Sequence, residues 1–168
     1  MSDDRSEINR SWADRHYAAI GKVATKWAAL EAEIDIRTVL LAGFDADTGA
    51  CLTAQIAGPA RKLDAYIALA RLRGASDDTM KKLGKFLEQT FSIGEKRNRI
   101  VHDQWYVFPS GPAIRFEITA RKKLIMRHEK HTTEDINQTI AAIAALIDRL
   151  DAIDKLVWAD VQASRETL

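Results

Sequence analysis

Arg97, Asn98 and His102 form a short cluster of side chains whose types suit chemistry at a phosphate group. The guanidinium of an arginine is a permanent cation whose planar fork of donors binds phosphate oxygens. Imidazole exchanges protons near neutral pH, so a histidine beside that cation can act as an acid or as a base. No other segment of the 168 residues points to chemistry as clearly.

The cluster lies on the last turns of a helix that is predicted from its acidic cap at 76–78 to His102. On an ideal helix Asn98 and His102 share a face, whereas Arg97 is rotated from His102 by roughly 140°. Arg97 and His102 can therefore converge only if the helix tightens or kinks, if the arginine side chain curls around, or if a second subunit supplies one group. Gly94, one turn earlier, marks a kink or a close backbone approach.

Apolar residues at intervals of three and four predict further helices on either side of this one. Their expected positions are 6–41, a short helix through Leu52 and Ile56, 59–74, and Thr132 to the end of the chain. The first would be about 50 Å long at 1.5 Å per residue. A compact monomer of this size cannot cover such a helix, so we expect part of it to pack against another subunit.

After His102 the pattern changes to alternation, which predicts strands. One strand is predicted from the alternation of two sets, Ile114, Phe116 and Ile118 against Arg115, Glu117 and Thr119. Its partner is 104–108 across a turn at 109–112, and 123–127 is a third candidate strand.

Together these elements predict a mainly α fold in one domain, residues 1–168. It is an antiparallel bundle of four to six helices, with a small β-hairpin or three-stranded sheet inserted at 104–128 before the last helix.

The composition limits the class of protein. Lys and Arg number 25 against 24 Asp and Glu, so there is no global attraction to nucleic acid or to an anionic membrane. The single cysteine, Cys51, excludes an internal disulfide and a thiolate zinc cluster. Residues 1–7 are polar and acidic, and no apolar run is long enough to span a bilayer. We expect a soluble cytoplasmic protein with no membrane partner.

Arg97, Asn98 and His102 match an Arg-(Asn/His/Asp)-x-x-x-His signature near the end of a helix. Through that signature the chain resembles the HEPN superfamily (higher eukaryotes and prokaryotes nucleotide-binding) of all-helical proteins. The resemblance covers residues 6–102 and the helix from Thr132, with the sheet as an insertion. It implies a homodimer in which two copies of the motif face each other across a cleft.

The resemblance further implies a metal-independent endoribonuclease of the toxin or antiviral type, which needs no cofactor. In that reaction a base takes the proton of a ribose 2′-hydroxyl, an acid protonates the 5′-oxygen, and a cation stabilises the phosphorane. Two copies of His102 would supply the base and the acid, and Arg97 the cation. Asn98 would orient His102 or hold a phosphate oxygen.

The resemblance also implies RNA and an antitoxin or regulatory protein as partners. In the branch where a nucleotidyltransferase antitoxin modifies its partner, a tyrosine stands two residues after the histidine. That position is Gln104 here, with Tyr106 two residues further on, so we do not assign that regulatory chemistry. Many members bind without cleaving, and a non-catalytic helical dimer that binds RNA, a nucleotide or a protein is the alternative.

Other polar clusters have competing interpretations. The cluster at the helix end also suits a structural role, because its side chains can cap carbonyls and pair with Glu95 and Asp103. Arg99 and a basic run are candidates for nucleic-acid binding; the run consists of Arg121, Lys122, Lys123, Arg127 and Lys130. The run suits equally well an edge strand that lysines protect from aggregation.

The remaining histidines and the tryptophans favour structural roles. His128 and His131 are spaced as a metal pair, but they lack a third ligand nearby in sequence and we interpret them as solvated turn residues. The four tryptophans, Trp12, Trp27, Trp105 and Trp158, could stack on bases, although their spacing favours the core, above all for Trp12 and Trp27.

Overall fold

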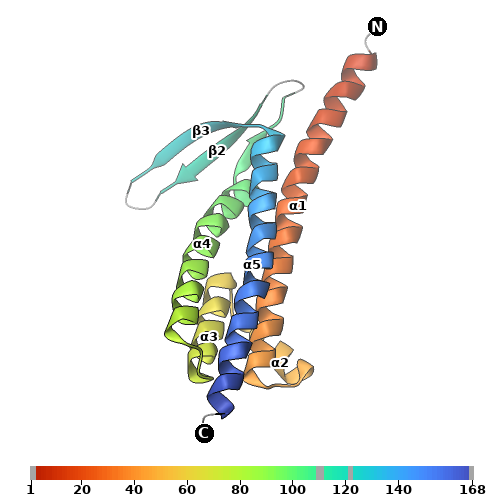
Figure 1. Cartoon of the computed structure of the whole chain (residues 1–168). Helices are drawn as coiled ribbons and strands as arrows, with labels where there is room; N and C mark the ends of the chain where they lie inside the picture. Colours follow the sequence, from red (N-terminus) through yellow and green to blue (C-terminus); the bar gives the residue numbers. More distant parts are fainter. Residues whose placement is uncertain (1–2, 109–111, 121–122, 167–168) are drawn as a thin grey trace. The chain divides into compact units, whose positions relative to one another are not determined.

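The computed structural model describes residues 3–108, 112–120 and 123–166. These ranges form five helices and one three-stranded antiparallel sheet in the order β1-β2-β3 (Figure 1). The helices are α1 (Asp3–Ala42), α2 (Ala46–Thr53), α3 (Pro59–Leu72), α4 (Asp77–His102) and α5 (Thr133–Glu166). The strands are β1 (Gln104–Tyr106), β2 (Ala113–Thr119) and β3 (Ile125–His131). The predicted mainly α fold, with a sheet inserted before the last helix, is confirmed.

Two predicted boundaries are wrong for identifiable reasons. Helix α2 ends at Thr53, before Ile56, because the amides of Gln55 and Ile56 donate three residues back, to the carbonyls of Leu52 and Thr53 at 3.1 Å, instead of continuing the α-helical pattern. It begins at Ala46, where the Asp45 side chain accepts a hydrogen bond from the Thr48 amide at 2.9 Å. Strand β3 continues to His131, beyond the predicted limit, because it pairs with β2 along the full length of that strand. Of the predicted turn at 109–112, residues 109–111 lie outside the described ranges.

The chain divides into two compact units. One consists of residues 1–27 and 93–143 and contains the sheet with the adjoining parts of α1, α4 and α5. The other consists of residues 28–92 and 144–168 and contains α2, α3 and the remaining parts of the long helices. The single domain expected from the sequence stays a prediction.

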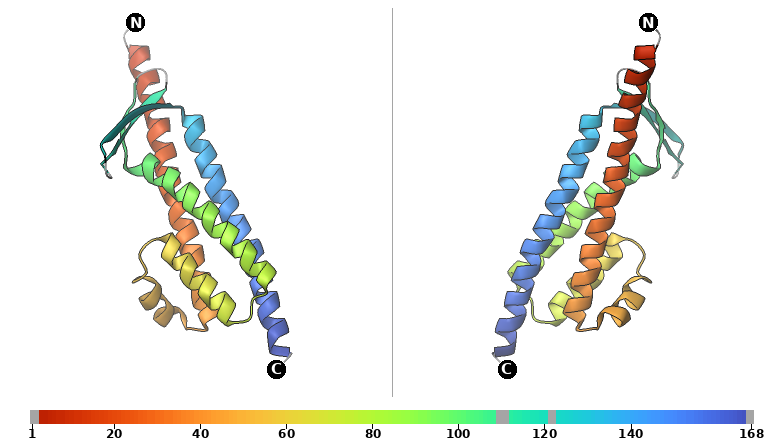
Figure 2. Two further views of the ribbon diagram at one scale, coloured as in Figure 1. Left: turned by 90° about the vertical axis from the view of Figure 1, so that its left-hand side faces the viewer. Right: turned by 90° about the vertical axis from the view of Figure 1, so that its right-hand side faces the viewer.

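In the unit without the sheet, α2 and α3 lie beside the C-terminal part of α1 (Figure 2). Its core is apolar and surrounds one buried tyrosine, Tyr66, whose hydroxyl donates a hydrogen bond to Asp154 at 2.5 Å. Burial and that hydrogen bond raise the pKa of Tyr66. Arg37 forms ion pairs with Asp151 and Asp154, and thereby connects α1 to α5 within this unit.

In the unit with the sheet, aromatic side chains surround a buried histidine. His16 of α1 is fully buried, with Trp12 stacked at a centroid distance of 5.7 Å and Trp105 edge-on at 4.9 Å. Burial, and then the charge of His131, lower the pKa of His16. His16 therefore favours the neutral form and belongs to the core.

The sheet turns its charged face inward. Arg115 and Glu117 on β2 are only 6% and 7% exposed, whereas Ile118 on the opposite face is 63% exposed. The predicted alternation along β2 is confirmed. Its charged residues face inward and its apolar residues outward, which is the reverse of the usual arrangement, in which the apolar face of an antiparallel sheet covers the core.

Ion pairs between the inner face and the end of α4 explain this reversal. Glu117 accepts from Arg99 of α4 at 2.7 Å. Arg115 lies between Asp103, at 3.8 Å, and Glu129 of β3, with which it forms a close ion pair. We refer to these five residues as the charged layer. A buried charge is tolerated only when it is paired, so the layer fixes which face of the sheet lies against α4.

The charged layer should contribute strongly to stability. Replacing Arg115 by alanine leaves Asp103 and Glu129 without their shared cation, and we expect the free energy of unfolding to fall by about 2–3 kcal/mol. The matched control is Lys82→Ala, because Lys82 forms an exposed ion pair with Asp78 at 3.0 Å that should contribute at most about 0.5 kcal/mol. Urea denaturation measures both values. Equal losses in the two variants would contradict the proposed role of the layer.

Candidate active site at the end of α4

Arg97 and His102 contact each other within one chain. A nitrogen of the Arg97 guanidinium, Nη1, lies 3.3 Å from Nε2 of the His102 imidazole. The same Nη1 donates a hydrogen bond to the Asn98 side-chain oxygen at 2.9 Å. The sequence allowed a tightened or kinked helix, a curled arginine side chain or a group from a second subunit. The structure shows the curled side chain: α4 continues as a helix to His102, and Arg97 reaches around it.

A close contact between α4 and α1 holds the arginine in this position. Gly94 faces Trp27, and a β-carbon at this glycine would lie 3.0 Å and 3.2 Å from two atoms of the indole ring. One turn later the Arg97 guanidinium carbon lies 6.0 Å from the centre of the same ring, within the range of a cation–π contact. The predicted close approach at Gly94 is confirmed, and it places Trp27 beneath the arginine.

The contact with Arg97 requires that Nε2 of His102 carries no proton. A guanidinium only donates hydrogen bonds, so Nε2 of His102 can take part in this contact only as an unprotonated acceptor. The imidazole is exposed, and so is the Asn98 side chain, while Arg97 is half-buried. A solvent-facing proton acceptor therefore lies beside a partly desolvated cation. That pair is suited to deprotonate a hydroxyl and to stabilise negative charge on a neighbouring phosphate.

Asp103, the residue after His102, belongs to the charged layer and not to the exposed motif. Burial raises the pKa of Asp103, against the opposing effect of Arg115 and Arg99. Burial would also raise the pKa of Glu129, but hydrogen bonds from His131 and Arg115 outweigh it, and that pKa is lowered. The acidic groups next to the motif are thus engaged in structural ion pairs, which leaves Arg97 without a carboxylate partner among the described residues.

The residues predicted to contact nucleic acid do not form one cluster in the structure. Arg99 is held by Glu117, which offsets its charge, although its side chain remains 41% exposed. Lys123, Arg127 and Lys130 are exposed along β3, an edge strand of the sheet. The predicted residues Arg121 and Lys122 lie outside the described ranges.

His128 and His131 lie in strand β3, so the predicted turn position is wrong. They are three residues apart in a strand and therefore point to opposite faces of the sheet. His131 lies 3.3 Å from Glu129, whereas His128 contacts Phe116 on the outer face. Within the described ranges, no three His, Cys, Asp or Glu side chains are close enough to hold a metal ion.

Each tryptophan is buried or half-buried in the structure. Trp27 belongs to the core, as predicted, and Trp12 is half-buried. Trp105 is half-buried as well, and its indole N–H donates to the carbonyl of Ile100 at 2.8 Å. Trp158 is also half-buried.

Two features of the site were not visible in the sequence. The first is Trp27 beneath Arg97, because an apolar stripe predicts burial and not the identity of the neighbour. The second is a row of rings on the outer face of the sheet: Tyr106 contacts Phe116, and Phe116 contacts His128, at centroid distances of 4.7 Å and 4.3 Å. The alternation along β2 placed Phe116 on the face opposite Arg115 but did not show which face lies outward, nor that Tyr106 and His128 flank this ring.

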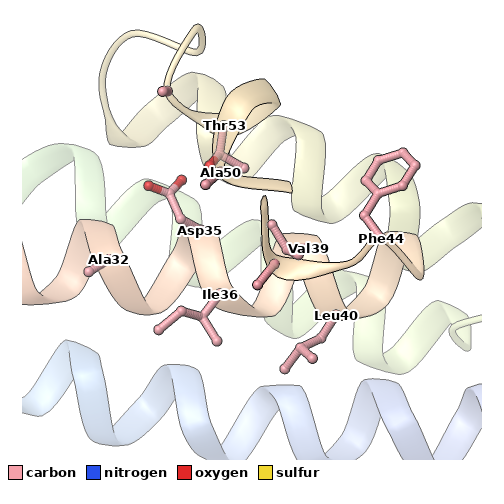
Figure 3. A pocket seen from close by; sticks show the side chains of 10 residues that line it. Ala32, Asp35, Ile36, Val39, Leu40, Phe44, Ala50 and Thr53 are labelled. Carbon is pink, nitrogen blue, oxygen red and sulfur yellow. The ribbon is translucent and has the colours of Figure 1, made fainter. Parts of the chain in front are cut away.

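The unit without the sheet has a hollow of about 470 Å³ between α1 and α2 (Figure 3). Its lining is mostly apolar, and its one charged residue, Asp35, accepts a hydrogen bond from Lys62. Ile36 and Leu40 on α1 and Phe44 after it are 53%, 57% and 48% exposed at this hollow. The polar side chains of the lining are Asp35 and Thr53, and the rest is apolar, so we regard it as an apolar contact surface.

Comparisons of the chain with family models, curated proteins and solved structures find no match. Among the described helices, none combines the length and the apolar character that crossing a membrane requires.

The contact between Gly94 and Trp27 can be tested with a matched pair of glycines on α4. A β-carbon added at Gly84 would meet no neighbouring group within 4 Å, so Gly84→Ala should raise the free energy of unfolding by up to about 1 kcal/mol through helix propensity. Gly94→Ala gains the same propensity but must displace a buried ring. We expect it to be less stable than Gly84→Ala by about 1–3 kcal/mol in urea denaturation. Equal stabilisation by both substitutions would contradict the close approach.

Proposed function

We propose that this chain is a metal-independent endoribonuclease of the HEPN type that acts as a homodimer. The observation that carries the proposal is the 3.3 Å contact between Nη1 of Arg97 and Nε2 of the exposed His102 imidazole. The signature Arg97, Asn98 and His102 supplies the family resemblance, and the mainly α fold with α4 ending at His102 is compatible with it.

The proposed reaction needs only groups that the protein and the RNA supply. When substrate binds, the Arg97 guanidinium turns from Nε2 of His102 to the phosphate, which frees the one lone pair of that nitrogen. Nε2 then takes the proton of a ribose 2′-hydroxyl, and the 2′-oxygen attacks the adjacent phosphorus. The bond from phosphorus to the 5′-oxygen breaks, and the leaving oxygen receives a proton from the protonated His102 of a second copy. Arg97 stabilises the additional negative charge of the phosphorane. The products are a 2′,3′-cyclic phosphate and a 5′-hydroxyl.

Asn98 has a positioning role in this proposal. Its side-chain oxygen accepts a hydrogen bond from the same Arg97 nitrogen that contacts His102. Removing this acceptor frees the guanidinium to leave His102 without removing either reacting group. Asn98→Ala should therefore reduce the rate less than Arg97→Ala or His102→Ala.

An exposed apolar row supports the proposed second copy. Ile36 and Leu40 are four residues apart on α1, a spacing that forms the ridges by which helices pack, and Phe44 continues the row. A second chain that covers this row would bury apolar surface that a monomer leaves in water. This supports the expectation that part of the first long helix contacts another subunit.

The test is incubation of the purified protein with mixed RNA in EDTA, followed by analysis of the new ends. The wild-type protein should leave 2′,3′-cyclic phosphates, and Arg97→Ala and His102→Ala should each lower the rate at least about 10²-fold. The control is Lys96→Ala, which removes an exposed cation from the same turn of α4 and should leave the rate unchanged. Circular dichroism should show that each variant keeps its helices.

Two outcomes would contradict the proposal that this chain is a ribonuclease. Cleavage that persists in His102→Ala would come from another group or from a contaminant. Binding of RNA, a nucleotide or a protein with no cleavage by the wild-type protein would favour the alternative, a helical dimer that binds without catalysis. In that alternative, the contacts of Arg97 with Asn98, His102 and Trp27 are structural.

A further inference from the structure

The outer face of the sheet carries one ring from each strand. Tyr106 comes from β1, Phe116 from β2 and His128 from β3, and they form a continuous row in which neighbouring rings are tilted by 60° and 56°. The Tyr106 side chain is 47% exposed, His128 is exposed and Phe116 is half-buried between them. The row therefore offers ring surface to a ligand across the whole width of the sheet.

The charges of this face favour an anionic ligand. Strand registers place eight described residues on it: Gln104, Tyr106, Ile114, Phe116, Ile118, Met126, His128 and Lys130. None of them is acidic, and one is a lysine. The nearby carboxylates of Glu117 and Glu129 lie on the inner face, where Arg99 and Arg115 neutralise them. The reversed polarity of the sheet thus removes acidic groups from the side that carries the rings.

Exposed cations accompany the row along one edge of the sheet. Lys130 is exposed on β3 on the face that carries the rings, and Lys123 is exposed just before β3, whereas Arg127, which pairs with Glu117 in the register, is exposed on the opposite face. The one acid of that strand, Glu129, is held by Arg115 and His131. Rings with cations beside them match the two parts of an unpaired nucleic-acid strand, because bases stack on aromatic faces while phosphates attract lysine and arginine.

We propose that the row Tyr106–Phe116–His128 is a stacking platform for unpaired bases of single-stranded RNA, with Lys130 on the same face and Lys123 at the start of β3 contacting its phosphates. Bases in a duplex are already stacked and paired, so the platform should select single strands. This binding site is separate from the motif of α4. It implies that the substrate of the proposed nuclease is single-stranded RNA.

The platform begins next to the candidate active site. Gln104 follows His102 by two residues and lies on the outer face, where its side-chain amide donates a hydrogen bond to the Tyr106 hydroxyl at 3.1 Å. An RNA strand that stacks on Tyr106 therefore lies on the segment that leads directly from His102. This link to cleavage rests on the proposed function, whereas the binding itself does not.

The experiment measures binding of a fluorescent 12-nucleotide oligouridine by anisotropy, in EDTA and with all proteins carrying His102→Ala to prevent cleavage. Tyr106→Leu and Phe116→Leu keep an apolar side chain but remove a ring, and each should weaken binding about fivefold to 100-fold. The matched control is Ile118→Leu, an exposed aliphatic residue of the same face, which should bind as the parent does. A duplex of the same length should bind more weakly than the single strand.

Three results would overturn the proposal. The first is equal affinity of Tyr106→Leu and Ile118→Leu for the RNA, and the second is binding of the duplex as tight as binding of the single strand. The third is that the parent protein binds no RNA, while Tyr106→Leu loses self-association. The last result would identify the face as a protein contact. Because Tyr106 is exposed, its variant should fold even if Phe116→Leu does not, and circular dichroism checks this.

The two proposals fail in different ways. Ring-dependent RNA binding without cleavage by the wild-type protein would support the platform and refute the nuclease. Cleavage that requires His102, combined with ring-independent binding, would support the nuclease and refute the platform.

Discussion

The ion pairs between β2 and the end of α4 determine how the sheet-containing unit is organised. Arg99 with Glu117, and Arg115 with Asp103 and Glu129, place charged side chains where an antiparallel sheet normally buries apolar ones. Once these charges are paired on the inner face, the register of the strands leaves the rings on the outer face. The same pairs use the acidic groups near the helix end, so neither the carboxylate of Asp103 nor that of Glu117 is directed to Arg97.

That arrangement separates side chains that form structural ion pairs from side chains of the candidate active site, although they are only a few residues apart in the chain. Asp103 faces the charged layer, while His102 is exposed and contacts Arg97. The position of Arg97 depends on Trp27, which the small Gly94 allows to approach α4. A proton acceptor and a cation thus adjoin, at one helix end, an aromatic face on which none of the described residues is acidic.

The sequence predicted those features that depend on local periodicity. The apolar stripes located α1, α3, α4 and α5. The last helix was expected from Thr132, and there the Thr132 amide donates a hydrogen bond to the Asp135 carboxylate at 2.7 Å, just before α5 begins. The end of β3 was missed because its last residues are all polar, so only pairing with β2 defines it.

Features that depend on a distant partner could not be predicted. An alternating strand has two faces, and its pattern does not tell which one lies inward; ion partners on α4 and β3 decide this for β2. The convergence of Arg97 with His102 likewise depends on a side-chain conformation supported by Trp27, which the helical spacing alone does not contain.

The most direct test of the central claim, that Arg97 donates to an unprotonated Nε2 of His102, is a two-bond ¹H–¹⁵N correlation spectrum of the histidine side chains at neutral pH. The wild-type protein should show His102 with its proton on Nδ1, and the Nε2 resonance should shift in Arg97→Ala because its donor is gone. A proton on Nε2 in the wild-type protein, or the same Nε2 resonance in both proteins, would contradict the account.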